Sequence, residues 1–335
     1  MTPKERIFTA LRRETPDRIP TFEWFIDTAV MQALCGSTDP VEVTEILDLD
    51  AVNIRADYTK TWKDDQTYID EWGIEKKLTG DILPASMGHP IPNVADQKNY
   101  VFPNPDTPER FKTLEKALKK YGDYRGIVLN LRDGFSDMRD LLGYQNALMD
   151  MLIDKQNYTD LLRRVVDYNL ALAELAVKRY DIRIVATTDD VCNATGPIIS
   201  PRVYADVIFP YFKEVVQGYR ALGLTVIKHC DGNIMPYLGM WLEAGINCLD
   251  PIDPLGKLDM AEMKAKYGHL ICLKGNIDCT GHLCTGTPEQ VDEEVRVCLE
   301  KGGPSGLIVS SSNTIHRGVK PENYRAMLDA IRKYG

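Results

Sequence analysis

The hydrophobic positions of the chain fall into short apolar runs that alternate with longer segments of helical period. Eight such runs can be counted, at residues 19–25, 51–55, 127–131, 182–187, 224–228, 247–249, 270–273 and 307–309. Strands that alternate with helices are typical of a parallel sheet, and eight strands are the number that closes a (β/α)₈ barrel. The pattern therefore predicts an α/β protein with the TIM barrel fold.

One long stretch, residues 62–105, interrupts this alternation. It contains three glycines and five prolines, and its segments near 68–72 and 74–78 have the pattern of a hairpin. A stretch of this length is too long for an ordinary connection, so we expect an insertion that covers one mouth of the barrel. The length alone would allow two domains, but no shift in composition marks a boundary, and a single domain over residues 1–335 is predicted.

Composition and charge exclude several classes of protein. The chain is 44% hydrophobic and 27% charged, which is typical of a soluble globular protein. It has no run of about 18 apolar residues and no apolar signal-peptide core, so we expect a cytoplasmic protein without a membrane span. A net charge of −9, with lysine and arginine scattered along the chain, argues against a nucleic-acid partner. The eight cysteines form no CxxC pair, which favours reduced thiols over a disulfide framework.

Polar residues follow every predicted strand, and in this fold the active site lies at the C-terminal ends of the strands. The candidate acid–base residues are His229, Asp231 and the adjacent pair Asp189 and Asp190, because clusters of ionisable groups at a barrel mouth are where pKa values become shifted. The candidate substrate-binding residues at other strand ends are Glu23, Trp24, Phe25, Arg55, Asn130, Asn276, Ser312 and Asn313. For Asp253 and Asp278 the alternative of a helix cap or an Asx turn is favoured.

The order of these motifs resembles the uroporphyrinogen decarboxylase superfamily over almost the whole chain. The resemblance rests on Asp189-Asp190, Gly196-Pro197, Ser200-Pro201-x-x-Tyr204, His229-Cys230-Asp231-Gly232-Asn233, Gly275-Asn276-Ile277-Asp278, Gly286-Thr287-Pro288-Glu289-x-Val291, Ser310-Ser311-Ser312-Asn313 and Pro321-Glu322-Asn323. It implies a (β/α)₈ barrel and either a decarboxylase or a methyltransferase that exchanges methyl groups with a corrinoid cofactor.

The segment 18–27 favours the methyltransferase branch. Decarboxylases of this superfamily carry an arginine-rich segment near the N-terminus that binds the carboxylates of the porphyrinogen, whereas this segment is acidic and aromatic. We expect much of the negative charge of the chain to line the barrel mouth, which would repel a polycarboxylate and suit a neutral, partly aromatic ligand. A decarboxylase-like lyase and a catalytically silent barrel that binds a methylated ligand stay open as alternatives.

Thiol-methylating members of the superfamily resemble one another in a zinc site of the form His-x-Cys with a distant cysteine. Here Asp231 stands two residues after His229, and the region after the last strand reads Asn313-Thr314-Ile315-His316. Without thiolate ligands the basis for zinc activation of a thiol is missing, so no metal is predicted. Two alternatives stay open: ligation by His229, Asp231 and a further carboxylate, and a zinc site at residues 279–284, whose spacing is tight.

The remaining branch resembles the methyltransferase components of O-demethylases, which move a methyl group from a methoxylated aromatic compound to the cobalt of a separate corrinoid (cobalamin) protein. Cleavage of an ether needs a proton at the leaving oxygen, and from their position at strand ends we expect His229 and Asp231, with Asp189 or Asp190, to supply it. Glu23 and Asn276 would bind a neighbouring hydroxyl, and Trp24 and Phe25 would pack against the ring. None of the five histidines lies in an Asp-x-His-x-x-Gly motif, so the corrinoid is expected to arrive on a partner protein. Methanol, a methylamine or a thiol stay open as the small-molecule methyl donor, and so does a homo-oligomeric state.

Overall fold

A computed structural model describes residues 1–80 and 82–335 and contains a curved parallel sheet at its centre. Within the described residues this sheet has seven strands in the order β1-β6-β7-β10-β11-β12-β13. They are β1 Ala51–Arg55, β6 Gly126–Arg132, β7 Ile184–Thr188, β10 Thr225–His229, β11 Cys248–Asp250, β12 Cys272–Ile277 and β13 Leu307–Ser311. Every neighbouring pair is parallel, which confirms the predicted TIM-barrel type of α/β fold.

The first of the eight predicted strands is not a regular strand. Residues 19–26 lie between β13 and β1 and form only isolated bridges, such as that of Thr21 with Val309. The Val309 N–H donates to the Pro20 carbonyl (3.1 Å), and the Asp50 N–H donates to the Thr21 carbonyl (2.8 Å). Pro20 has no N–H to give to a ladder, which explains why an apolar run here pairs with both edge strands without becoming a strand itself.

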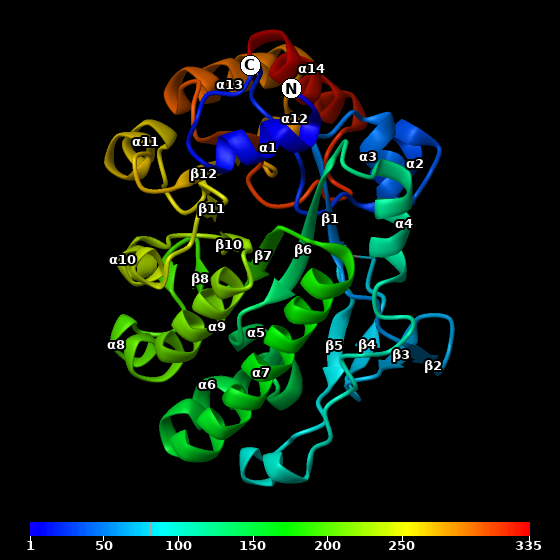
Figure 1. The fold of residues 1–335 in the computed structure, drawn as a ribbon, viewed down its shortest axis with the longest axis vertical. Coiled ribbons are helices and arrows are strands. Elements are labelled where there is room, and N and C mark those ends of the chain that lie inside the picture. The colour runs from blue at the N-terminus through cyan, green and yellow to red at the C-terminus, as the bar shows by residue number, and fades with distance from the viewer. Residues whose placement is uncertain (81) are drawn as a thin grey trace.

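Helices surround the sheet, as Figure 1 shows, and both termini lie at the same end of the molecule. They are α1 Pro3–Leu11, α2 Thr28–Cys35, α3 Pro40–Ile46, α4 Lys112–Tyr121, α5 Phe135–Leu142, α6 Tyr144–Ile153, α7 Lys155–Tyr180, α8 Pro201–Val203, the π-helix η2 Tyr204–Ile208, α9 Phe209–Ala221, α10 Met235–Ala244, α11 Met260–Tyr267, α12 His282–Thr285, α13 Pro288–Gly302 and α14 Pro321–Tyr334. Among the described residues, no helix is both long enough and apolar enough to cross a membrane.

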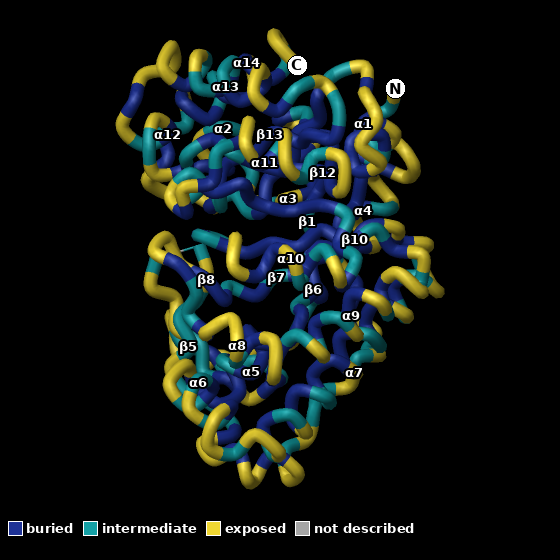
Figure 2. Tube along the Cα trace, turned by 90° about the vertical axis from the view of Figure 1, so that its left-hand side faces the viewer, coloured by how far each residue is buried: buried dark blue, intermediate teal, exposed yellow. Residues whose placement is uncertain are grey.

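Side chains on the two faces of the strands belong to two separate apolar cores. Ile184 and Ala186 of β7 and Ile227 of β10 point into the barrel, where α1 packs against the same cluster through residues such as Leu11. The alternate residues, such as Val185, point outward to the helices. The strands therefore run through the buried centre of the molecule, as Figure 2 shows. This alternation decides which strand-end side chains reach the barrel mouth.

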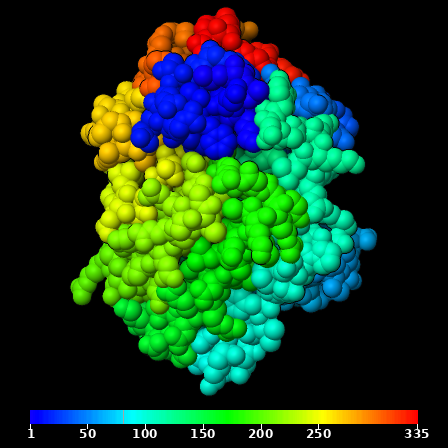
Figure 3. Space-filling model, in the orientation of Figure 1, coloured from blue at the N-terminus to red at the C-terminus, as the bar shows by residue number. Residues whose placement is uncertain are grey.

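The predicted insertion is more elaborate than a hairpin. It forms a four-stranded antiparallel sheet in the order β2-β3-β4-β5, followed by a 3₁₀ helix. These elements are β2 Lys60–Trp62, β3 Thr67–Asp70, β4 Glu75–Lys77, β5 Ala85–Gly88 and η1 Val94–Asn99. In the space-filling view, the cyan atoms of the insertion and the green atoms of the α5–α7 region together make up the end of the molecule opposite the termini (Figure 3).

Candidate functional site

The end of β10 carries the central side chain of the site. Ile227 points into the barrel, Lys228 points outward toward Trp241, and His229 points inward again. The His229 ring is 2% exposed and stacks on the buried ring of Trp24, with 4.1 Å between the centroids and 8° between the planes. The imidazole is therefore held at the mouth by stacking as well as by its hydrogen bonds.

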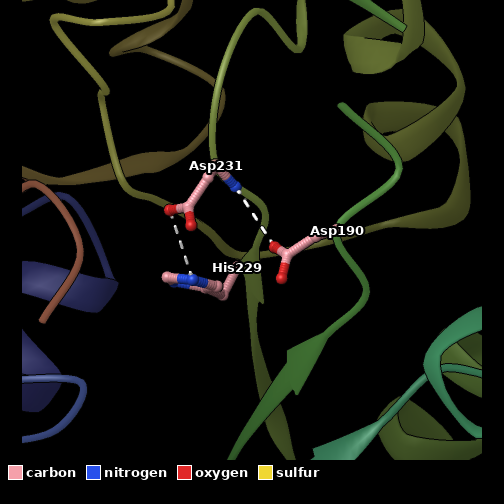
Figure 4. Close-up of side chains that lie close together, drawn as sticks. All are labelled: Asp190, His229 and Asp231. Carbon is pink, nitrogen blue, oxygen red and sulfur yellow. Dashed lines mark hydrogen bonds and ion pairs between the residues drawn. The ribbon is translucent and has the colours of Figure 1, made fainter. Parts of the chain in front are cut away.

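Carboxylates face both ring nitrogens of His229. Its Nδ1 lies 2.9 Å from Oδ2 of Asp250, which ends β11, and its Nε2 lies 3.5 Å from Oδ1 of Asp231. The other oxygen of Asp231 accepts a hydrogen bond from Nδ2 of Asn313 (2.5 Å). The Asp231 backbone N–H points to the carboxylate of Asp190 (3.4 Å), which comes from the end of β7 (Figure 4). Four strand ends thus meet at one histidine.

The protonation states follow from these contacts. Burial raises the pKa of Asp231 to about 7, with His229 acting against this shift and Asp190 adding to it. Burial favours neutral His229, but Asp250 and Asp231 outweigh it and raise the pKa of the ring. Burial likewise disfavours ionised Asp250, yet Lys274 and His229 lower its pKa. Asp250 is therefore an ionised acceptor that fixes a proton on Nδ1 of His229. Asp231, which faces Nε2, takes up a proton more readily than an exposed carboxylate does.

The structure separates the two adjacent aspartates that the sequence analysis treated as a pair. Asp190 faces the mouth, whereas the Asp189 carboxylate accepts hydrogen bonds from the backbone N–H groups of Phe135 and Ser136 at the start of α5. Asp189 lies beside Asp133 and the outward-pointing Lys228, whose Nζ also contacts the Asp189 carbonyl at 3.2 Å. Asp189 thus binds the positive end of a helix, and a catalytic role for it does not fit this position.

The predicted residues of the first segment lie in three different surroundings. Glu23 is buried, and Oε2 of its carboxylate accepts a hydrogen bond from the Ser311 hydroxyl (2.6 Å), so it lies within the barrel. Trp24 is also buried and supports His229. Phe25 is half-buried beneath the Arg55 guanidinium, 4.4 Å from ring centroid to Cζ. Glu23 and Trp24 therefore contact Ser311 and His229, whereas Phe25 contacts Arg55.

The remaining predicted residues lie around the same mouth. Asn313 binds Asp231, and the Ser312 hydroxyl accepts from the Cys279 N–H (3.2 Å). Asn276 lies on β12 opposite Ser310, and Asn130 lies near the end of β6. Asp253, which was favoured as a turn residue, does accept the backbone N–H groups of Gly232 and Leu255.

Sequence reasoning missed two residues that control His229. Asp250 and Lys274 both directly follow predicted strands. Polar residues follow every predicted strand, so this position alone did not distinguish them. Lys274 is fully buried on β12, and its Nζ donates to Oδ1 of Asp250 at 2.8 Å. The available signal was a lysine inside an apolar strand, because a buried lysine requires a charged partner.

A cavity of about 690 Å³ lies between the ends of β1 and β6 and the insertion. Arg55, Asn130 and Arg132 line its barrel side, and Tyr68 and Trp72 line its insertion side. Phe25 connects it with the histidine cluster, because Phe25 contacts Arg55 and packs edge-to-face on Trp24, which stacks on His229. The insertion thus encloses a space beside the cluster, in agreement with the predicted cover.

The charge of this cavity is mixed, so the acidic character expected of the barrel mouth does not extend to it, although Asp190, Asp231 and Asp250 lie around His229. Its lining includes five cationic side chains and four aspartates, namely Arg55, Lys60, Lys76, Arg132 and Arg139 against Asp57, Asp70, Asp137 and Asp140. The net charge of −9 therefore does not describe the surface of this cavity, where cationic and acidic side chains nearly balance. A lining of mixed charge does not favour a neutral ligand, and residues 18–27 still contain no arginine-rich segment.

One group of described residues could hold a metal ion. Ligand atoms of Asp190, His229 and Asp231 lie within 4.8 Å of one another, and Oδ1 of Asp231 is a buried oxygen without a hydrogen-bond partner among the described residues. The group contains one imidazole and two carboxylates, so a thiolate zinc site does not fit, whereas a harder divalent cation fits these donors. At the alternative site 279–284, His282 instead binds Glu294 through Nδ1 (3.0 Å). All eight cysteines are unpaired.

Comparisons with known proteins agree with this architecture. The chain is 25% identical to the methylcobamide:CoM methyltransferase MtbA of Methanosarcina mazei over 319 residues, 90% of each protein. It is also 25% identical to the uroporphyrinogen decarboxylase of Actinobacillus succinogenes over 267 residues, 74% of this chain and 71% of that protein. The solved structure of a methyltransferase from Methanosarcina mazei superimposes with a TM-score of 0.80 and 19% identity, covering 100% of this chain and 99% of that one. The pattern of the uroporphyrinogen decarboxylase (URO-D) family matches residues 71–334, and the chain belongs to this family.

Proposed function

We propose that this protein is the methyltransferase component of a corrinoid-dependent demethylase that cleaves a methoxylated, aromatic compound. The observation that carries the proposal is the close pair of His229 and Asp231 at the barrel mouth, with 3.5 Å between Nε2 and Oδ1, next to a cavity with aromatic walls. The likeness to a methylcobamide:CoM methyltransferase over 90% of both chains supports the methyl-transfer class. This similarity concerns the class of reaction, and the methyl donor of this chain must be identified by experiment.

The chemistry of ether cleavage requires such a proton. In the proposed reaction, reduced cobalt of a corrinoid partner protein supplies both electrons of the new carbon–cobalt bond, and the bond between the methyl carbon and the ether oxygen breaks. An alkoxide or phenolate is a poor leaving group, so the oxygen must receive a proton as the methyl group departs. Asp231 supplies this proton. His229, which Asp250 and Trp24 hold in place, stabilises the negative charge that is left on the Asp231 carboxylate.

The segment at residues 18–27 makes a uroporphyrinogen decarboxylase the weaker alternative. Glu23 is buried against Ser311, and Phe25 lies beneath Arg55, so the segment brings no arginine to the mouth. A porphyrinogen with many carboxylates needs many cationic donors, whereas Arg132 and Lys76 of the cavity are already paired with Asp140.

A direct experiment tests the function. The purified protein is mixed with a reduced corrinoid protein and, in separate reactions, with methoxylated aromatic compounds, methanol, methylamines and methylated thiols, and methyl-cobalt absorbance is recorded. We expect a signal with at least one methoxylated aromatic compound. A signal only with another donor class would reassign the substrate, and decarboxylation of uroporphyrinogen without any methyl transfer would overturn the proposal.

The pH dependence of the reaction should report the acid. Because burial raises the pKa of Asp231 to about 7, its protonated form is abundant below that pH and falls tenfold for each pH unit above it. We therefore expect kcat/KM to fall as the pH rises above about 7. In the Asp231→Asn variant this decrease of kcat/KM above pH 7 should be absent. Methylation of the same corrinoid protein by methyl iodide, which needs no proton, is the control. A rate that rises with pH would contradict a proton donor.

The proposed proton transfer needs no metal, and this can be tested separately. Asp190, His229 and Asp231 would hold a divalent cation, which would act as a Lewis acid on the ether oxygen when bound. We expect demethylation to stay within about twofold of its initial rate after dialysis against a chelator, with metal content measured by mass spectrometry. Loss of activity that an added divalent cation such as magnesium or zinc restores would assign the role to a Lewis acid.

A further inference from the structure

The cavity beside the histidine cluster contains a cation whose charge is not compensated by a direct partner. Asp137 and Asp140 lie 3.0 and 2.9 Å from Nη1 of Arg132, and Asp140 also lies 3.1 Å from Nζ of Lys76. These two carboxylates therefore serve two other cations. The Arg55 guanidinium makes no ion pair or hydrogen bond within residues 1–80 and 82–335, and it lies over the face of Phe25.

The two other aspartates of the cavity are also occupied. The carboxylate of Asp57 accepts hydrogen bonds from the backbone N–H and the hydroxyl of Thr113, at 2.8 and 2.7 Å. Asp70 accepts from the backbone N–H groups of Trp72 and Ile74, both at 3.0 Å. Partial burial and repulsion from Arg132 lower the pKa of Arg55 to about 10, so the guanidinium is still charged at neutral pH.

A second unpartnered donor lines the same cavity. Asn130 is 4% exposed, and its Nδ2 is a buried atom without a hydrogen-bond partner in the described part of the chain. Asn130 of β6 pairs in register with Arg55 of β1, so the two residues are neighbours across the sheet. A buried amide donor without an acceptor is costly, and a guanidinium offers paired donors suited to a carboxylate.

We propose that Arg55 and Asn130 form a carboxylate-binding subsite, and that the methyl donor is therefore a methoxylated aromatic acid with a single carboxylate. The carboxylate would accept hydrogen bonds from the Arg55 guanidinium and the Asn130 amide. Successive contacts from Arg55 to Phe25, Trp24 and His229 connect this subsite with the cluster that contains the proton donor Asp231. The choice of a methoxylated donor rests on the proposed function, whereas the subsite itself rests only on the unpartnered donors.

Binding measurements test the subsite without any methyl transfer. Isothermal titration calorimetry is performed with 4-methoxybenzoate, with benzoate and with neutral methoxybenzene on the wild-type protein and on Arg55→Met. We expect both acids to bind the wild type more tightly than methoxybenzene does. Arg55→Met should weaken the binding of both acids by about 10- to 100-fold and leave methoxybenzene unchanged, because only the acids lose a charged hydrogen bond.

Matched variants separate this effect from a general loss of charge or of folding. Lys60→Met removes a cation from the exposed rim of the same cavity and should change acid binding by less than about threefold. Arg55→Lys should restore part of the affinity, and Asn130→Asp should abolish acid binding through repulsion. Circular dichroism melting curves check that each variant is folded. Equal acid binding by wild type and Arg55→Met, or equal binding of the acid and the neutral ether, would overturn the subsite.

The outcomes distinguish the subsite from the proposed function. If the acids bind through Arg55 but no methyl-cobalt forms, the subsite stands and the demethylase proposal fails. If neutral ethers are demethylated while acids neither bind nor react, the demethylase proposal stands and the subsite fails.

Discussion

Replacing Asp231 by asparagine is expected to lower kcat/KM for demethylation by about 10²- to 10⁴-fold, the contribution typical of a general acid. The substitution keeps the size of the side chain and an oxygen that can accept from Asn313, which now donates at 2.5 Å. It removes the carboxyl proton that the oxygen of the leaving group requires. The measurement is the initial rate of methyl-cobalt formation at pH 6, where Asp231 is mainly protonated in the wild type.

Asp278→Asn is the matched control. Asp278 lies just after β12, and its Oδ1 accepts from the backbone N–H and the hydroxyl of Thr280, both at 2.8 Å, so it belongs to a local turn. We expect this variant to keep kcat/KM within about threefold of wild type, a change below about 1 kcal/mol. If Asp231→Asn stays within the same range, Asp231 is not the acid.

Replacing Lys228 by alanine is expected to lower the free energy of unfolding by about 3–5 kcal/mol, because it leaves a buried carboxylate without its cation. Nζ of Lys228 lies 2.8 Å from Oδ2 of Asp133, and both side chains are almost completely buried. Burial acts to raise the pKa of Asp133, but Lys228 outweighs it and holds this pKa below its usual value. The loss should therefore be largest near neutral pH and should shrink in acid, where Asp133 of the variant can take up a proton.

Chemical denaturation of the variants measures this effect. Lys213→Ala removes an equally short but exposed ion pair, with Glu243 at 2.7 Å, and should cost about 1 kcal/mol or less. Asp133→Asn in the Lys228→Ala background should recover part of the loss by removing the uncompensated charge. Equal losses for Lys228→Ala and Lys213→Ala would show that the buried pair does not stabilise the fold in this way.

The alternation along the chain was sufficient to predict the barrel but not the irregular first segment. Seven of the eight apolar runs overlap parallel strands, because burial between helices and barrel interior requires continuous apolar residues. The run at residues 19–25 also contains apolar residues, but Pro20 has no N–H for a regular ladder, and the segment forms only isolated bridges. The bridge of Thr21 with Val309 joins residues that are far apart in the chain, so the local pattern of apolar and polar residues does not reveal it.

The sequence by itself determined that His229 and Asp231 lie at one strand end, because both come directly at the end of an apolar run that predicts a strand. Only the tertiary structure decided that Asp190, and not Asp189, joins them, and that Asp250 and Lys274 fix the histidine proton. It also decided that the Arg55 guanidinium has no carboxylate partner within the described part of the chain. The physical reason is that protonation and charge pairing depend on distances between strand ends that are far apart in the chain. Residue counts give the total charge, whereas the fold decides which charges meet.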